Sequence, residues 1–306
     1  MVYYLFLDEF PNKADSEEIC KTYYEKICVS LPEFRKNKSD KIRKASARLT
    51  NALAYFLFDY ALKTEYPDIF KQKGCYPFSN FDYNEYGKPS LPAPYQNIHF
   101  NISHANGAVA CIVDDHEVGV DIQDVRPVSE RVLKKYDLPD CTTINYNTNN
   151  CDSYNCDSYD CDNYDCDNHS NDKINLFFKF WTRFEAYCKL TGEGIGKNMN
   201  IKPDIFLAPK IPYPLPCDSF HNNKASDAVK DNTVNNTINN TVNNTINNIQ
   251  TNSFSSRITE ISLATKKISS EKNMAAYYMS AATLSDKSVN FIEVSLHSLL
   301  SSYSFC

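Results

Sequence analysis

The stretch that decides the fold, residues 97–123, reads NIHFNISHANGAVACIVDDHEVGVDIQ. Apolar and polar residues alternate in its first part as far as His104, which is the period-two pattern of a half-buried strand. The segment 108–113 is almost wholly apolar and predicts a buried strand. A polar break at 114–117 follows, and we interpret 118–122 as the returning arm of a hairpin. The stretch therefore predicts one small sheet that carries His104 near the polar face of its last strand.

The last strand of this stretch places its polar side chains together. Val120 and Ile122 face one side of the strand, and Asp121 and Gln123 share the other side. An imidazole such as that of His104 can donate a hydrogen bond to a phosphate, and a carboxylate such as that of Asp121 can hold a divalent cation. The sequence therefore predicts an anion site and a cation site close to each other.

Composition limits the classes of protein to consider. The chain has 306 residues, of which 42% are hydrophobic and 13% aromatic, which is enough for a substantial core. A formal net charge of -6 disfavours nucleic-acid binding, which normally requires a basic excess. The segment 1–9 predicts a first strand rather than a signal peptide, and no run reaches the roughly 20 apolar residues of a membrane span. We therefore expect a cytoplasmic protein with neither nucleic acid nor membrane as a partner.

A basic segment precedes a long predicted helix. We expect this helix to begin at Ser39, with Ser39 or Asp40 as its cap, because apolar residues recur at helical spacing as far as Tyr60. The basic residues of the segment fall within 35–48, before the helix and in its first turns. They are Arg35, Lys36, Lys38, Lys41, Arg43, Lys44 and Arg48. They form either a solvated helix face or an anion site for a phosphorylated ligand, since lysine and arginine neutralise phosphates.

Two further motifs carry polar groups of interest. The turn Glu-Tyr-Gly-Lys-Pro at 85–89 leads into the strand before His104 and places Lys88 beside unobstructed backbone. The stretch 176–197 has a helical apolar stripe and ends in glycines. Glu185 and Lys189 lie one turn apart on this helix, so they either act at one point or form a surface ion pair worth about 0.2–0.5 kcal/mol.

Two repeats interrupt these patterns. Residues 151–167 repeat Cys-Asp-Ser/Asn-Tyr-Asn/Asp, and residues 232–247 repeat Asn-Thr-Val/Ile-Asn. We interpret both as parts of disordered low-complexity insertions, at 141–172 and 221–255, whose removal should leave activity largely intact. A metal site built by the Cys-Asp repeat is the alternative, but this spacing fits neither one helix face nor a thiolate knuckle.

The remaining segments complete the expected fold. Residues 128–136 predict a short helix. The apolar runs 274–282 and 289–296 predict the closing strands of a second sheet, and 296–300 predicts a short terminal segment. These elements are consistent with a mixed fold of helices and sheets.

The order of the motifs is more informative than any one of them. It runs from a basic helix through a Tyr-Gly-Lys-Pro turn, an Asn-x-Ser-His strand end and a Gly-Val-Asp-Ile strand to a Trp-x-x-x-Glu-Ala-x-x-Lys helix that closes on Gly-x-Gly. Over residues 35–205, apart from the Cys-Asp repeat, this order resembles the 4'-phosphopantetheinyl transferase superfamily of the surfactin synthetase-activating (Sfp) type.

The resemblance implies both a fold and a reaction. The fold would be α+β, a monomeric pseudo-dimer of two similar halves, 1–118 and 119–306, with coenzyme A and magnesium in the cleft between them. The protein would be a transferase of the holo-[acyl-carrier-protein] synthase type. It would move phosphopantetheine from coenzyme A to a serine of an apo acyl or peptidyl carrier protein and release 3',5'-ADP.

The resemblance also assigns roles to single residues. Asp121 and Glu185 would be magnesium ligands, and Glu185 would also be a candidate base for the carrier serine. His104 would hydrogen-bond a phosphate of coenzyme A, Lys88 would hold the nucleotide end, and Lys189 would contact the pyrophosphate. Glu185, Lys189 and His104 are thus the predicted catalytic residues.

Other positions match the family less directly. Arg48 and part of the basic cluster that begins at Lys36 look similar to nucleotide-phosphate contacts of the family. Gln123 stands where the family often has a second acid, so its amide oxygen or a water would complete the metal coordination. Phe184 stands where a lysine commonly precedes the helix glutamate. We expect Phe184 to extend the core, because the neighbouring Arg183 points about 100° away around the helix.

These departures leave an alternative open. A degenerate relative would bind coenzyme A or a carrier protein without transferring anything. The presence of His104, Asp121, Glu185 and Lys189 together disfavours this alternative, since a binding module does not need all of them.

Overall fold

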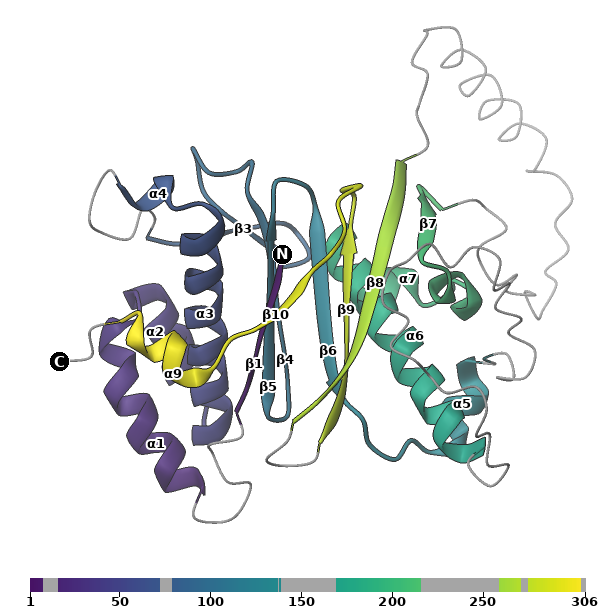
Figure 1. The fold of residues 1–306 in the computed structure, drawn as a ribbon, viewed down its shortest axis with the longest axis horizontal. Helices are drawn as coiled ribbons and strands as arrows, with labels where there is room; N and C mark the ends of the chain where they lie inside the picture. Colours follow the sequence, from purple (N-terminus) through teal and green to yellow (C-terminus); the bar gives the residue numbers. More distant parts are fainter. Residues whose placement is uncertain are drawn as a thin grey trace, which may run out of the picture.

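The protein is described by a computed structural model covering residues 1–7, 16–71, 79–136, 138, 169–215, 259–270 and 275–303. These residues form four layers, in which two sheets lie face to face and each outer face carries a long helix (Figure 1). The mixture of helices and sheets confirms the expected α+β fold. Most of both predicted insertions lies outside the described residues, although helix α6 begins at His169, within the range 141–172.

The first sheet has the strand order β10-β1-β5-β4. Its strands are β1 (Val2–Phe6), β4 (His99–Ala105), β5 (Ala108–Asp114) and β10 (Phe291–Glu293). The helical segments on its side are α1 (Ser16–Ile27), η1 (Cys28–Ser30), α2 (Glu33–Asp40), α3 (Ala45–Glu65), α4 (Asp68–Lys71) and α9 (Leu296–Ser301). The small hairpin of β2 (Asp82–Tyr83) and β3 (Pro89–Ser90) precedes β4.

The second sheet has the strand order β6-β9-β8-β7. Its strands are β6 (Val118–Asp124), β7 (Lys210–Tyr213), β8 (Thr259–Ser269) and β9 (Ala276–Thr283). The helical segments on its side are α5 (Glu130–Tyr136), α6 (His169–Thr191), α7 (Gly194–Asn198) and η4 (Pro203–Leu207). The expected first strand, the short helix within 128–136 and the helix that ends at the glycines are confirmed.

The apolar patterns explain why the two sheets stack. Val109 and Val113 of β5 pack into the core beneath α3, whereas Ala110 and Ile112 pack into the core between the sheets. Because both faces of β5 are covered, its residues 108–113 are all apolar and buried. The alternation in β6 is confirmed. Val120 and Ile122 enter the core between the sheets, whereas the opposite face of the strand lies against α6.

The predicted hairpin of 108–113 with 118–122 is wrong. Strand β5 pairs with β1 and β4, whereas β6 pairs with β9 in the other sheet. The hairpin is instead formed by β4 and β5, with a turn at Gly107, whose φ of 84° favours glycine. His104 and Asp121 therefore lie on different sheets, and the segment 114–117 carries the chain from one sheet to the other.

The single helix predicted from Ser39 is also wrong. Helix α2 ends at Asp40, and α3 begins at Ala45. The carboxylate of Glu17, in α1, accepts hydrogen bonds from the backbone N–H groups of Ala45 at 2.7 Å and Ser46 at 3.3 Å. A residue distant in sequence thus satisfies the N-terminal donors of α3, which the local pattern does not reveal.

The C-terminal tail differs in part from its prediction. Strand β9 lies in the second sheet as expected, but β10 lies in the first sheet, parallel to β1. The tail then forms α9, and the hydroxyl of Tyr303 bonds the buried carboxylate of Asp59 in α3. None of the helices in the described part of the chain is long and apolar enough to cross a membrane.

Candidate active site

The carboxylate of Asp121 is the most buried charged group at the junction of the two sheets, with 1% of its residue surface exposed. Ser103 Oγ and Lys189 Nζ donate to its Oδ1 at 2.9 and 2.7 Å, and Gln123 Nε2 donates to its Oδ2 at 3.1 Å. Lys189 Nζ also donates to Ser103 Oγ at 2.8 Å and to the carbonyl of Val120 at 3.0 Å. The buried charge is thus both paired and hydrogen-bonded, as a stable buried carboxylate requires.

Gly119 brings helix α6 close enough to reach Asp121. A Cβ built at Gly119 would lie 2.0 Å from the carbonyl oxygen of Ala186 and 2.5 Å from the backbone nitrogen of Leu190. Only glycine fits this contact, because backbone atoms on both sides cannot move aside as a flexible side chain would. Since Gly119 and Asp121 share one face of β6, this contact sets the height of α6 above the carboxylate.

Glu185 completes the site from α6. Its carboxyl group hydrogen-bonds Asp121 and also receives a hydrogen bond from the indole N–H of Trp181, one turn earlier. Burial and the negative charge of Asp121 raise the pKa of Glu185 to about 7, although the ammonium of Lys189 opposes this rise. Two such adjacent carboxyl groups fit a divalent cation, since magnesium prefers hard oxygen ligands. A cation bound there would replace the proton that the raised pKa keeps on Glu185.

His104 lies within electrostatic reach of Asp121 and of two ammonium groups, those of Lys189 and Lys38. Although its side chain keeps an exposed edge, the loss of part of its hydration and the ammonium of Lys189 lower the pKa of the imidazole. Lys38 of α2 acts in the same direction, and Asp121 opposes it. Partial burial and the charge of Arg35 likewise lower the pKa of Lys38. An imidazole close to two ammonium groups can donate a hydrogen bond to an anion that their positive potential attracts.

Other predicted nucleotide contacts are placed differently. Arg48 Nε and Nη2 donate to the carbonyl of Ile42 at 2.9 and 2.8 Å, and the guanidinium lies over the ring of Tyr24. Lys36 is exposed on α2. The structure therefore shows a structural role for Arg48 and brings Lys38 rather than Lys36 into the field of His104. The nucleotide roles of Arg48 and Lys36 stay predictions.

Lys88 is engaged at the end of helix α6. Its ammonium contacts the carboxylate of Glu117 and donates to the carbonyl of Leu190 at 2.7 Å. Glu117 also pairs with His99 Nδ1 at 3.3 Å. Hydrogen bonds from His99 and then from Lys88 lower the pKa of Glu117 to about 2. Glu117 could not be predicted from the local pattern, because its partners Lys88 and His99 come from two other segments of the chain.

The two residues before Glu185 are structural. Phe184 is buried and packs against Phe180 and Phe206, which confirms that it extends the core. Arg183 is also buried, and it donates to Thr265 Oγ1 at 2.6 Å and to the carbonyl groups at the end of η4. Arg183 therefore does not take the place of the lysine that the family commonly has at position 184.

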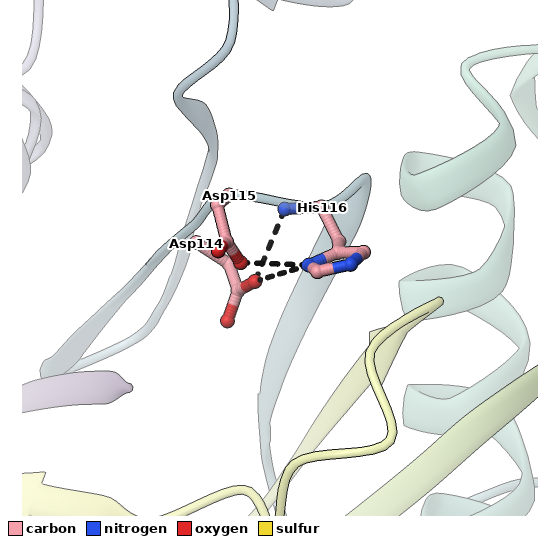
Figure 2. A group of neighbouring side chains, drawn as sticks. All are labelled: Asp114, Asp115 and His116. Carbon is pink, nitrogen blue, oxygen red and sulfur yellow. Dashed lines mark hydrogen bonds and ion pairs between the residues drawn. The ribbon is translucent and has the colours of Figure 1, made fainter.

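A second group of possible metal ligands lies on the connection between β5 and β6. Figure 2 shows Asp114, Asp115 and His116 there, with one ligand atom of each within 4.8 Å of the others. Hydrogen bonds to Asp115 and then Asp114 raise the pKa of His116, and Lys287 Nζ lies 3.3 Å from Asp115. His116 and Lys287 already compensate the carboxylates of this group, so we assign no metal to it.

The chain is similar in sequence to several known proteins. No protein-family model matches the chain. The 4'-phosphopantetheinyl transferase HetI of Nostoc sp. is 31% identical over 140 residues, which are 44% of this chain and 50% of that protein. The 4'-phosphopantetheinyl transferase gsp of Aneurinibacillus migulanus is 28% identical over 115 residues, which are 38% of this chain and 39% of that protein. The transferase Sfp of Bacillus subtilis is 28% identical over 115 residues, 38% of this chain and 42% of Sfp.

The chain is therefore similar to the 4'-phosphopantetheinyl transferase superfamily, and within it to the Sfp-like type. The relatives that it matches are named as transferases. The matched region spans half of the length of HetI and less than half of gsp and Sfp.

The raised pKa of Glu185 predicts how the stability of the metal-free protein depends on pH. The folded protein holds a proton at Glu185 up to about pH 7, whereas the unfolded chain releases it near 4.5. The free energy of unfolding should therefore fall as pH rises through this window, and the loss should be complete above pH 7. Glu185→Gln removes the titration, so its melting temperature without metal should exceed the wild-type value at pH 8 and approach it at pH 4.5.

The control for this measurement is Glu193→Gln, which changes an exposed glutamate just after the same helix. It should melt like the wild type at both pH values. A Glu185→Gln protein that is less stable than the wild type at pH 8 would contradict the assignment of the raised pKa.

Proposed function

We propose that this protein is a magnesium-dependent 4'-phosphopantetheinyl transferase. It moves phosphopantetheine from coenzyme A to a serine hydroxyl of an apo acyl or peptidyl carrier protein and releases 3',5'-ADP. The observation that carries the proposal is the convergence of Asp121, Glu185 and Lys189 on one point with His104 beside it. The similarity to named 4'-phosphopantetheinyl transferases supports the same reaction.

The carboxyl groups of Asp121 and Glu185 would hold the magnesium ion. When bound there, magnesium neutralises the negative charge that develops on the leaving phosphate. Gln123 is the candidate third ligand. Its amide nitrogen donates to Asp121 in the structure, and a half-turn of the amide would present its oxygen at the same place.

The other polar groups of the site would bind and orient coenzyme A. Lys189 is fixed by Asp121 and Ser103, and its ammonium would meet the pyrophosphate. His104 would donate a hydrogen bond to a phosphate, and Lys38 would add positive charge on the same side. The carrier serine would attack the phosphorus that bears pantetheine, the bond from that phosphorus to 3',5'-ADP would break, and Glu185 would take the serine proton directly or through a water.

We also propose that the fold is a pseudo-dimer of the halves 1–118 and 119–306. Each half pairs a sheet with a long helix, α3 in the first and α6 in the second, although β10 and α9 return to the first. The candidate site draws Ser103 from one half and Asp121 from the other. Coenzyme A would therefore lie at the boundary between the two halves. One chain then supplies the whole site, and we propose a cytoplasmic monomer that acts without nucleic acid or membrane.

A degenerate relative that only binds coenzyme A or a carrier protein is the second candidate. The observations that favour it are Gln123 in place of a second acid and the burial of Phe184 in the core. Such a protein would retain the anion site around His104 and lack the transfer step.

Release of 3',5'-ADP separates the two candidates. We expect chromatography to detect 3',5'-ADP when the protein is incubated with coenzyme A, magnesium and an apo carrier protein, in an amount that matches the carrier. The product should disappear when EDTA is added or when the acceptor serine of the carrier is replaced by alanine. Binding of coenzyme A without release of 3',5'-ADP would instead support the degenerate relative.

A further inference from the structure

The turn between β2 and β3 covers the C-terminal end of helix α6. Asn84 Oδ1 accepts hydrogen bonds from the backbone N–H groups of Tyr86 at 3.0 Å and Lys88 at 2.8 Å, which fix the shape of the turn. Asn84 Nδ2 donates to the carbonyl of Gly192 at 3.3 Å, and Lys88 Nζ donates to that of Leu190 at 2.7 Å. Two carbonyl groups at the end of the helix, which have no N–H partner within it, thus accept hydrogen bonds from side chains of this turn. The ammonium of Lys88 is held in a defined place.

Glu117 takes a large share of the hydrogen-bonding capacity of this ammonium. An ammonium group has three N–H donors, and Glu117 and the carbonyl of Leu190 engage two of them. The side chain of Lys88 is 16% exposed and that of Glu117 is 43% exposed, so the ion pair is only partly screened by solvent. His99 holds the other carboxylate oxygen of Glu117. Within the protein, the charge of Lys88 is therefore already balanced by Glu117.

We propose that Glu117 is an internal competitor for the anion that Lys88 binds, and that it thereby sets the affinity for the nucleotide end of coenzyme A. The inference rests on the proposed function, in which Lys88 holds that end. A phosphate group that approaches Lys88 must displace the carboxylate of Glu117 or share the ammonium with it. In both cases the two negative charges repel each other and weaken binding. The same competition would favour release of 3',5'-ADP, because this product keeps the nucleotide phosphates.

The competition predicts a tighter nucleotide complex when Glu117 loses its charge. Glu117→Gln keeps the shape of the side chain and an oxygen that accepts hydrogen bonds. Calorimetry should show that it binds 3',5'-ADP about twofold to fivefold more tightly than the wild type, which is the range expected for a partly exposed ion pair. Phosphopantetheine alone lacks the nucleotide, so its affinity should be unchanged.

A double-mutant cycle separates competition from a general effect of charge. Lys88→Gln should weaken binding of 3',5'-ADP, and adding Glu117→Gln to it should then change nothing, because the competitor acts only through Lys88. Asp115→Asn is the matched control. It removes the same charge from the same connection but from a residue that pairs with His116 and Lys287, so it should bind like the wild type.

Each other outcome would overturn the inference. Equal tightening by Glu117→Gln and Asp115→Asn, or undiminished tightening in the Lys88→Gln protein, would show only long-range repulsion. A Glu117→Gln protein that binds 3',5'-ADP with the same affinity as the wild type would also contradict competition. This result would leave the proposed function intact. If neither coenzyme A nor 3',5'-ADP binds to the folded wild type and Glu117→Gln proteins, the proposed function itself fails and the inference fails with it.

Discussion

Asp121→Asn should lower kcat/KM for phosphopantetheine transfer at least about 100-fold, which is the usual loss when a group that stabilises the transition state is removed. The substitution keeps the shape of a buried side chain but takes away the charge that would hold magnesium and that pairs with Lys189. Steady-state kinetics with saturating coenzyme A would measure the loss. The variant should keep its fold, because Lys189 is partly exposed and its ammonium can remain hydrated after it loses the charge of its partner. Circular dichroism would check this.

Asp124→Asn is the matched control for this loss. Asp124 lies on the same strand, but its carboxylate pairs with Arg126, two residues further along the chain and exposed at the surface. The control should keep kcat/KM within about twofold of the wild type, because exposed ion pairs contribute little. An Asp121→Asn protein that transfers as well as Asp124→Asn would remove Asp121 from the mechanism.

Gly119→Ala should both destabilise the protein and reduce its activity. The added Cβ would collide with backbone atoms of α6 at 2.0 and 2.5 Å, so the helix must move away from β6. We expect a loss of about 3 kcal/mol in the free energy of unfolding, at the upper end of the usual cost of overpacking. The movement also separates Glu185 and Lys189 from Asp121, and a misplacement of about 1 Å can cost roughly 100-fold in rate.

Gly196→Ala is the control for this substitution. Gly196 lies exposed in α7, and a Cβ built there meets nothing within 4 Å. Alanine should therefore be neutral or stabilise this helix by up to about 1 kcal/mol. Urea unfolding of both variants would measure the difference. A Gly119→Ala protein with wild-type stability would show that the close contact between α6 and β6 is not required.

Much of the candidate site could be predicted from short patterns in the sequence. The alternation in β6 places Asp121 and Gln123 on one face, and the helical spacing in α6 aligns Glu185 with Lys189. Both patterns depend on the local geometry of a single element, and the structure brings Asp121, Glu185 and Lys189 together as expected.

Features that depend on contacts between distant segments could not be predicted in this way. The apolar pattern identified β6 as a strand but did not indicate its partner, so the hairpin with β5 was wrong. The cap of α3 comes from Glu17, and the partners of Glu117 come from the β2–β3 turn and β4. We predicted Lys36 as a nucleotide contact, whereas the packing of α2 brings Lys38 into the electrostatic field of His104.

The most direct test of the proposed transferase activity is the intact mass of an apo carrier protein after incubation with this protein, coenzyme A and magnesium. The proposal predicts that the carrier gains the mass of one phosphopantetheine group, and that the gain is absent with Asp121→Asn and present with Asp124→Asn. Several acyl and peptidyl carriers should be compared. No gain on any of them, with coenzyme A demonstrably bound to the wild-type protein, would contradict the proposal that this protein transfers phosphopantetheine.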